Sequence, residues 1–406
     1  MKFLAIFLFV YLLEGALQIF LYLANLSYAR KMSKVPEILK DVMNKDDFEK
    51  SRLYTIEKMQ FNILKTIIGT LLMLILIIAG VPYIERLVSR VPLNEVFQGI
   101  LFFFVVYAIY YIINLPIEYY RIFVLEKKYG FSKMNLKLFV SDELKQILIS
   151  AVLGFVVLFT FFYIASITSN WWLFVSLFAV FFVILSQIIF PFILPLFNKL
   201  EPIKDTGLKT KIEELAKRVS LSISNIFVID ESKRSLHTNA SFSGFGRWKR
   251  LILYDTLLKV HPEDEILAIV AHEIGHYIKR HIIKFTVLTS LILFAVVYSV
   301  SVLSNSTVIN LAFGVDKFYS VILYAFIFIS SIMSLFEFAF NSISRKFEYE
   351  GDSVSAELTS KQSIINALKR LAKANLSFPY AHPLFVLYKY SHPTILERIE
   401  AVEKIR

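Results

Sequence analysis

One stretch decides the fold of this chain: Pro262-Glu-Asp-Glu-Ile-Leu-Ala-Ile-Val-Ala-His-Glu-Ile-Gly-His-Tyr-Ile-Lys279. A proline suits the first position of a helix, acidic residues fill the first turn, and apolar residues recur at helical spacing, so the stretch is predicted to be a helix. His272 and His276 then lie one turn apart on one face. This H-E-x-x-H arrangement aims two imidazoles at one zinc ion, with Glu273 beside them to take a proton from water. Zinc lowers the pKa of bound water from nearly 16 to about 7, so a carboxylate can deprotonate it near neutrality.

The composition is that of a polytopic membrane protein. Of the 406 residues 56% are hydrophobic and 39 are Phe, and the mean hydropathy is +0.61. A soluble chain is about 45–50% apolar and lacks apolar runs of about twenty residues. The net charge of +11 comes from Lys and Arg that lie between the apolar runs, where they face anionic lipid. No nucleic-acid motif is present, and the absence of cysteine excludes thiolate zinc ligands.

Seven apolar runs are long enough to cross a bilayer. They cover residues 3–25, 62–84, 96–117, 146–167, 171–196, 285–304 and 318–340. The polar segments between them alternate between basic and nearly uncharged. By the positive-inside rule the N-terminus is outside, and the segments 26–60, 121–145, 198–284 and the chain from 341 onward are cytoplasmic. Every candidate catalytic residue then lies on the cytoplasmic side.

The zinc site needs a third protein ligand, because a catalytic zinc ion has three and keeps its fourth position open for water. The metzincin continuation would place Gly and His where this chain has Lys279 and Ile282, so that class is excluded. A downstream carboxylate is the alternative. Glu348 and Asp352 follow the seventh apolar run and are four residues apart, hence on one helical face. One can bind zinc while the other orients a ligating histidine, and Glu350 points elsewhere.

Three motifs together resemble the type I CaaX prenyl endopeptidases, which are integral-membrane zinc proteases. They are His272-Glu-Ile-Gly-His276, Arg345-Lys-Phe-Glu-Tyr-Glu-Gly-Asp352 and Ser391-His-Pro-Thr-Ile-Leu-Glu-Arg-Ile399. Similar segments occur along almost the whole chain: Ser51-Arg-Leu-Tyr-Thr-Ile-Glu-Lys58, Leu125-Glu-Lys-Lys-Tyr-Gly-Phe131, Pro191-Phe-Ile-Leu-Pro-Leu-Phe-Asn-Lys199 and His237-Thr-Asn-Ala240. The resemblance implies a mostly α-helical protein with seven transmembrane helices around a water-filled intramembrane chamber. A gluzincin-like zinc domain with a small β-sheet covers the cytoplasmic end.

This architecture divides the chain into four segments. Residues 1–197 form an N-terminal membrane region with five helices and cytoplasmic loops. Residues 198–284 are the first part of the protease domain and contain the H-E-x-x-H helix. Residues 285–340 are transmembrane helices six and seven, and residues 341–406 complete the protease domain with the third zinc ligand. Within the second segment, residues 225–230 and 250–255 are expected to be short strands.

The resemblance also assigns the site residue by residue. It makes His272, His276 and Glu348 the ligands of one zinc ion, Glu273 the general base and Asp352 the partner of a ligating histidine. Other residues face the substrate: His392 and Arg398 beside the scissile carbonyl as oxyanion donors, and Asn239 and Ala240 along its backbone.

From the residues alone, Ser391-His-Pro reads as a helix start, with Arg398 paired to Glu397 or Glu400, and Asn239 reads as an ordinary turn residue. Three positions depart from the family, since Gly351 stands where Ala is usual and Ser241 and Ser243 replace bulkier aromatic residues. His281, His261 and His382 are expected to be helix-end or surface residues.

The leading hypothesis is a membrane-embedded zinc endopeptidase that cuts near the C-terminus of CaaX substrates, prenylated or not. Its expected partners are a peptide bound as an extended strand, the lipid bilayer and a prenyl or other lipid chain in the chamber, with no nucleic acid. The membrane would be the cell membrane in a prokaryote or the endoplasmic reticulum in a eukaryote. A quality-control protease of the HtpX type is the second hypothesis. A non-catalytic zinc-bearing scaffold or transporter is the third.

Overall fold

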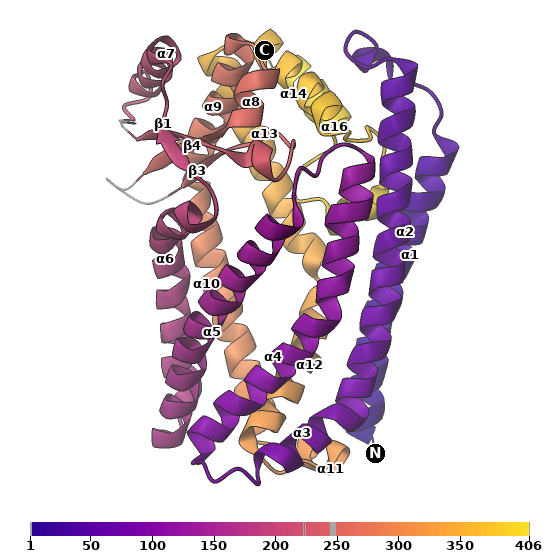
Figure 1. Ribbon diagram of the computed structural model, residues 1–406, viewed down its shortest axis with the longest axis vertical. Coiled ribbons are helices and arrows are strands. Elements are labelled where there is room, and N and C mark those ends of the chain that lie inside the picture. The colour runs from indigo at the N-terminus through magenta and orange to yellow at the C-terminus, as the bar shows by residue number, and fades with distance from the viewer. Residues whose placement is uncertain (1, 222, 224, 244–248, 406) are drawn as a thin grey trace.

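The computed structural model describes residues 2–221, 223, 225–243 and 249–405. Long helices extend from one end of the molecule to the other, and a domain of shorter helices and one sheet covers one end (Figure 1). The N-terminus lies at the opposite end. The expected architecture, mostly helical with a small sheet, is confirmed.

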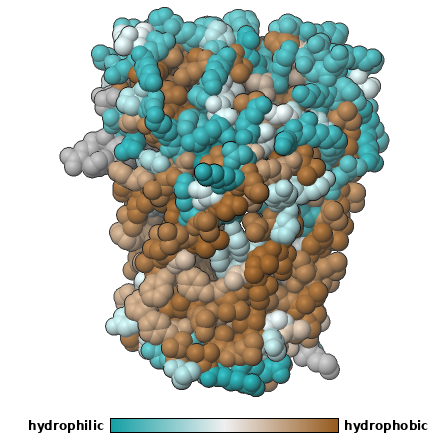
Figure 2. All heavy atoms as spheres, viewed as in Figure 1, coloured by the Kyte–Doolittle hydropathy of each residue, from teal (hydrophilic) through white to brown (hydrophobic). Residues whose placement is uncertain are grey.

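The long helices form an apolar band between two hydrophilic ends (Figure 2). Within the described ranges, six of them are long and apolar enough to cross a membrane, and a bent pair gives a seventh crossing when it is counted as one span. The predicted seven spans agree with that upper count. The six are α1 (Lys2–Lys31), α2 (Lys45–Ile75) with η2 (Leu76–Gly80) and α3 (Val81–Val88), α4 (Glu95–Tyr120) with η3 (Arg121–Glu126), α5 (Leu136–Ile167), α6 (Trp171–Phe197) and α10 (His281–Ser304).

Helix α2 begins well before the apolar run that predicted it. Its start is fixed by a capping box, in which the Asn44 side chain accepts a hydrogen bond from the Asp47 backbone and the Asp47 side chain accepts one from the Asn44 backbone. The helix therefore continues from the bilayer into the polar end of the molecule. This continuity gives α2 a polar stretch that includes Tyr54 and Lys58.

The bent pair joins the membrane to the covering domain. Helix α12 (Phe318–Leu335) ends at Phe336, where the chain turns by 53° into α13 (Glu337–Leu358). The seventh predicted span, 318–340, therefore ends a few residues early, and its last part belongs to α13. The bend directs α13 into the domain, where it packs along α9 (Glu263–Ile278).

The covering domain contains one four-stranded sheet in the order β1-β2-β4-β3. Its strands are β1 (Leu200–Pro202), β2 (Ile226–Ile229), β3 (Ala240–Ser243) and β4 (Arg250–Tyr254), so both predicted strands are found. The two central strands are parallel, and β3 pairs antiparallel with β4, with Ala240 opposite Leu253. Strand β3 is therefore an edge strand, and it packs against α9.

The remaining short helices of the described chain complete the two ends. Those around the sheet and α9 are η1 (Glu37–Leu39), α7 (Thr206–Lys217), η4 (Glu231–Lys233), α8 (Asp255–Val260), α14 (Lys361–Ala374), α15 (Pro383–Lys389) and α16 (Ile395–Glu403). Helix α11 (Val308–Phe313) lies with α3 at the other end (Figure 1).

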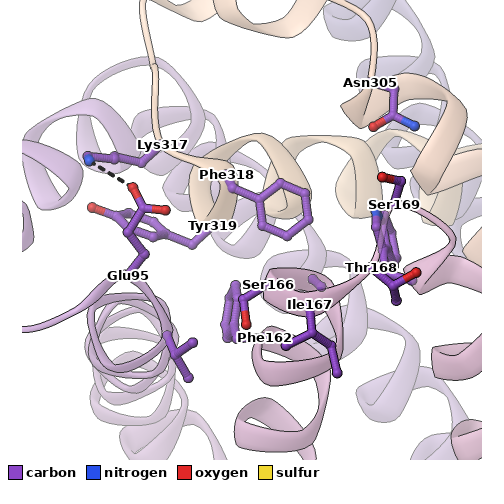
Figure 3. A pocket seen from close by; sticks show the side chains of 13 residues that line it. Glu95, Phe162, Ser166, Ile167, Thr168, Ser169, Asn305, Lys317, Phe318 and Tyr319 are labelled. Atoms are coloured by element: carbon purple, nitrogen blue, oxygen red, sulfur yellow. Dashed lines mark hydrogen bonds and ion pairs between the residues drawn. The ribbon is translucent and has the colours of Figure 1, made fainter.

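A cavity of about 670 Å³ opens at the end that holds α3 and α11. Figure 3 shows its lining, with the rings of Phe162 and Phe318 facing inward and an ion pair between Glu95 and Lys317 at 3.3 Å. Asn305 follows the last residue of α10, a helix of 24 residues that starts beside the H-E-x-x-H helix. At 1.5 Å per residue α10 is roughly 35 Å long. This cavity is therefore remote from the predicted metal site.

Candidate metal centre and active site

Helix α9 holds the first part of the site rigidly because most of it is buried. Nine of its 16 residues are buried, among them Val270, Ala271 and Ile274, which are fully inaccessible to solvent. The helical spacing places His272 and His276 on the same side, with their Nε2 atoms 3.0 Å apart. A third ligand from outside the helix is therefore needed to complete a site.

Helix α13 supplies this third group. Glu348 Oε2 lies 3.4 Å from His272 Nε2, and Glu348 Oε1 lies 3.4 Å from His276 Nε2. The carboxylate is buried, and one of its oxygens, Oε2, has no hydrogen-bond partner among the described residues. Such a bare, buried anion is costly unless a cation balances it.

The donor set fits a tetrahedral zinc ion. Bonds of about 2.0–2.1 Å to histidine nitrogen and carboxylate oxygen place neighbouring donors of a tetrahedron about 3.3 Å apart. The observed separations of 3.0, 3.4 and 3.4 Å lie close to this value. His272, His276 and Glu348 form the one group of at least three such residues within ligating reach that the described part of the chain contains. These residues could hold a single metal ion.

Asp352 fixes the outer side of His272. Its Oδ1 lies 2.9 Å from His272 Nδ1, and since a carboxylate can only accept, the imidazole donates there and keeps its Nε2 lone pair for a metal. Asp352 also accepts two hydrogen bonds from Arg398, at 2.8 Å from Nε and 2.6 Å from Nη2. The sequence-only pairing of Arg398 with Glu397 or Glu400 is therefore wrong, because α16 turns this guanidinium inward.

A second chain of contacts supports His276, and sequence reasoning missed it. His276 Nδ1 lies 2.8 Å from His281 Nδ1, and His281 Nε2 lies 2.9 Å from Glu350 Oε2. His281 is 2% exposed and its ring stacks on Phe347 with centroids 4.0 Å apart. His281 is the first residue of α10, so the helix-end expectation holds, but it is buried rather than at the surface. The reason is that Arg280 adopts a left-handed conformation, with φ 55°, which folds α10 back against α9.

Two glycines allow α9 and α13 to approach closely at the ligands. A Cβ atom at Gly275 would lie 3.1 Å from Gly351 Cα, and a Cβ atom at Gly351 would lie 2.9 Å from His272 Cε1. Both distances are shorter than ordinary van der Waals contact. Gly351, one of the positions where the chain departs from the resembled family, thus lies directly against the His272 ring.

The carboxyl group of Glu273 lies at the border between the metal site and the sheet edge. Burial raises the pKa of Glu273 above its usual range, although the nearby His272 and His276 oppose the shift. The carboxylate also receives a hydrogen bond from the backbone of Phe242 in β3. Glu273 is thus adjacent to both imidazoles without an ion-pair partner of its own among the described residues.

The free edge of β3 provides backbone groups beside this carboxylate. Tyr254 N donates to Asn239 O at 3.1 Å, so these two residues form a hydrogen-bonded pair of the ladder. Because such pairs alternate, the backbone groups of Ala240 and Phe242 point to the open edge. The Asn239 side chain accepts a hydrogen bond from Ala240 N at 2.9 Å and is exposed. The two predicted substrate-facing residues therefore begin the edge that reaches Glu273.

His392 and Arg398 lie on the other side of the metal ligands. His392 Nε2 is 3.2 Å from Glu348 Oε1, and its side chain is 60% exposed, so it can reach a bound molecule. Arg398 Nη1 is 3.6 Å from Glu348 Oε2. Both residues also line a cavity of about 540 Å³ that continues along α2. All nine residues assigned from the sequence thus lie on α9, α13, β3 and its start, or the start of α16, around one centre.

Comparison with known proteins agrees with this geometry. Residues 25–199 match the family described as CAAX prenyl protease N-terminal, five membrane helices, and residues 202–406 match Peptidase family M48. The chain is 33% identical to CAAX prenyl protease 1 of Saccharomyces cerevisiae, over 92% of this chain and 89% of the relative. It is 34% identical to the CAAX prenyl protease 1 homolog of Dictyostelium discoideum, over 97% and 95% of the two chains.

A solved structure is also similar over the whole length. The crystal structure of S. mikatae Ste24p superimposes with a TM-score of 0.91 at 31% sequence identity, covering 99% of both chains. The similarity therefore extends over both the apolar helices and the covering domain. The chain belongs to peptidase family M48, with the membrane region of the CAAX prenyl proteases, and is a multi-pass membrane metalloendopeptidase.

Proposed function

We propose that this chain is a zinc endopeptidase that cleaves CaaX-type substrates near their C-terminus at the cytoplasmic face of its membrane. The observation that supports it most directly is the triangle of His272, His276 and Glu348, with the Glu273 carboxylate beside it, which has no ion-pair partner among the described residues. A structural zinc site needs neither an open coordination position nor an adjacent base. The CaaX substrate class follows the names of the relatives.

A zinc ion held by these three residues would supply a Lewis acid that polarises the scissile carbonyl and favours deprotonation of water. Glu273 accepts the proton of the attacking water and then donates it to the leaving amine. Its raised pKa suits both steps, since a base that must also act as an acid works best with a pKa closer to neutrality.

Arg398 and His392 stabilise the negative charge that develops on the carbonyl oxygen. Asp352 holds Arg398 through Nε and Nη2, which leaves Nη1 directed toward the metal ligands. His392 contributes Nε2 from an exposed position next to Glu348. Donors fixed before the reaction are the most effective, because they need no reorganisation when the charge appears.

The substrate binds as an additional strand on the free edge of β3. The backbone groups of Ala240 and the carbonyl group of Phe242 pair with it, since the Phe242 N–H donates to Glu273. The Asn239 side chain exchanges its hydrogen bond with Ala240 for one with the peptide. A prenyl or other lipid chain on the substrate then extends between the membrane helices, where apolar side chains line cavities of about 550 Å³. The four-segment domain division described from the sequence is part of this proposal.

The test replaces Glu273 by Gln in the purified, zinc-loaded enzyme. Glutamine has the same shape but cannot accept the proton, so zinc content should stay at one per chain while peptide cleavage falls by at least about 10³-fold. Glu357→Gln, on the exposed side of α13, is the matched control and should retain activity. Cleavage at the normal rate by the Glu273→Gln enzyme would contradict the mechanism.

A panel of matched prenylated and unprenylated peptides then tests the substrate class. Preferred cleavage of prenylated peptides near the C-terminus supports the CaaX assignment. Equal cleavage of both, at internal sites of unfolded membrane proteins, would favour quality control instead. Full zinc binding without cleavage of any peptide would indicate a non-catalytic zinc-bearing scaffold or transporter.

A further inference from the structure

We propose that Lys58 binds the free C-terminal carboxylate of the substrate, and so determines which peptide bond reaches the metal. This inference rests on the proposed endopeptidase function and adds to it a recognition element for the end of the chain. It is supported by the position of Lys58 in the cavity, by the lack of a partner for its charge and by the polar groups around it.

Lys58 shares a cavity with the residues that face the scissile bond. The cavity of about 540 Å³ is lined by His392 and Arg398 at one side and by Thr55, Lys58 and Asn62 of α2 at another. A molecule bound at His392 can therefore extend toward Lys58 without leaving the cavity. The long polar start of α2 places the lysine there, although it belongs to a helix that crosses the membrane.

The ammonium group of Lys58 has no ion-pair partner among the described residues. By contrast, Lys389 in the same cavity lies 2.8 Å from Glu337, and Lys128 nearby lies 2.5 Å from Glu57. Lys58 Nζ instead lies over the ring of Tyr54, 4.8 Å from its centroid. A partly buried ammonium group that lies over the face of an aromatic ring and lacks an ion-pair partner in the described chain is available to bind an anionic ligand.

The carboxylate that acts most strongly on Lys58 is already occupied. Glu126 accepts hydrogen bonds from Tyr54 Oη at 2.8 and 2.9 Å, and its Oε2 lies 3.4 Å from His237 Nε2. It exerts an attraction on Lys58, but does not lie within 4.0 Å of its ammonium group. Glu126 thus stabilises the positive charge of Lys58 from a distance and leaves the group itself free.

Thr55 and Asn62 add hydrogen-bonding groups on the same face of α2. They are three and four residues from Lys58, which is the spacing that aligns side chains along a helix. Neither side chain makes a hydrogen bond within the described residues, and both line the cavity. One cation with a hydroxyl and an amide suits a single negative charge, such as a peptide carboxylate, better than a doubly charged phosphate.

The length of the expected leaving fragment fits this arrangement. Three residues in extended conformation span about 10 Å, since each contributes about 3.3 Å. A tripeptide that begins at the scissile bond therefore brings its carboxylate a short distance along the cavity, to where Lys58 can bind it. Binding there places the fourth residue from the end at the metal, which makes the position of the cut depend on the chain terminus.

The experiment compares two peptides that differ only in ending with a carboxylate or a carboxamide. The zinc-loaded enzyme in lipid-free detergent should show a KM for the carboxamide that is about 10- to 100-fold higher, with little change in kcat, because the contact is made equally in the ground and transition states. In Lys58→Gln this difference should vanish while the carboxamide peptide is cut at the unaltered rate, and Lys58→Arg should restore most of it. Lys50→Gln, at an exposed position of α2 outside these cavities, is the matched control and should keep the full difference.

Three outcomes would overturn the inference. The first is equal cleavage of the two peptides by the unaltered enzyme, and the second is the full difference in Lys58→Gln. The third is an effect of Lys58→Gln that appears only with vesicles containing anionic phospholipid, which would assign the lysine to a lipid headgroup. If Lys58→Gln fails to fold, inhibition of the unaltered enzyme by the free tripeptide, but not by its carboxamide, provides the same decision. Failure of the enzyme to cut either peptide would instead contradict the proposed function.

Discussion

Helices α9 and α5 differ in how much of their surface the protein covers, although both are apolar. Nine of the 16 residues of α9 are buried, whereas only two of the 32 residues of α5 are, namely Phe139 and Phe162. The apolar windows of the six single spanning helices are between 6% and 22% buried. Helix α9 is therefore covered by protein on most sides, whereas the six spanning helices bury a smaller share of their apolar surface.

This difference separates two tasks. Metal ligands must be held to within a fraction of an ångström, which requires close packing on both sides of α9 and directed contacts such as those of Asp352. The spanning helices expose most of their apolar side chains, which suits contact with lipid, and they also pack against one another in a buried cluster that includes Phe7, Phe102 and Phe162. The two regions therefore differ in the share of their surface that the protein covers.

Truncating one apolar side chain to alanine in each helix tests whether α9 is packed more tightly than α5. Ile274→Ala in α9, where the side chain is fully buried, should lower the free energy of unfolding by about 2–5 kcal/mol. Leu148→Ala in α5, where the side chain is 65% exposed within the protein, should change it by less than about 1 kcal/mol. Thermal unfolding in one detergent, followed with zinc removed from both variants, measures the two effects.

The zinc-free comparison matters because loss of the metal would otherwise add to the effect of Ile274→Ala. The enzyme with both residues intact, also without zinc, is the reference. Similar destabilisation by the two substitutions would show that α5 is packed as tightly as α9.

The contacts from His276 to His281 and from His281 to Glu350 allow the same question to be asked of a single side chain at the metal site. His281→Ala should lower the affinity for zinc by about 10- to 100-fold, because the imidazole of His276 loses the group that orients it. Competition with a coloured zinc chelator measures this affinity without any reliance on catalysis. His382→Ala, at the start of α15, is the matched control.

An unchanged zinc affinity in the His281→Ala protein would show that packing alone orients His276. Partial recovery in His281→Asn, whose amide can still contact His276, would support orientation through the hydrogen bond.

The smallest expected effect concerns the buried pair at the start of α9. Burial lowers the pKa of His261, and its Nδ1 donates to Glu265 at 2.7 Å. Its Nε2 is buried and has no hydrogen-bond partner in the described part of the chain. Glu265 also accepts a hydrogen bond from Arg370 at 2.8 Å, so added charge on His261 is poorly balanced. Stability should therefore be complete above the ordinary histidine pKa of about 6.5 and decline by about 1 kcal/mol per pH unit below it.

The free energy of unfolding, measured in detergent at pH 7.0 and 5.5, tests whether stability falls as the pH is lowered. His261→Gln cannot take up the proton, so its free energy of unfolding should fall less between these two pH values than that of the unaltered protein. Parallel losses in both proteins would assign the pH dependence to other groups.

The sequence predicted the parts of the molecule that depend on local spacing. The H-E-x-x-H helix, the mostly helical fold and the apolar spans follow from periodicity and length, and the structure confirms them. The relation of Glu348 to Asp352 also follows from spacing, because both lie on one face of α13. The motif resemblance supplied what spacing cannot, namely a place for Arg398 at the site, whereas its two hydrogen bonds to Asp352 are seen only in the structure.

Contacts between distant segments could not be predicted in the same way. His281 looked like a helix-end residue because nothing in its neighbourhood shows that α10 folds back onto α9 and meets Glu350. The first residue of α2 was also not predicted, because a polar, charged segment resembles a loop in sequence. The structure shows that the capping box of Asn44 and Asp47 starts the helix there. In both cases the missing information lies in packing rather than in composition.

The metal ligands come from segments separated in the chain by α10 and α12, which both lie in the membrane. During synthesis His272 and His276 emerge first and remain incomplete until this hairpin has been inserted and Glu348 follows. The complete donor set can therefore form only after both membrane helices and the segment that follows them have been made.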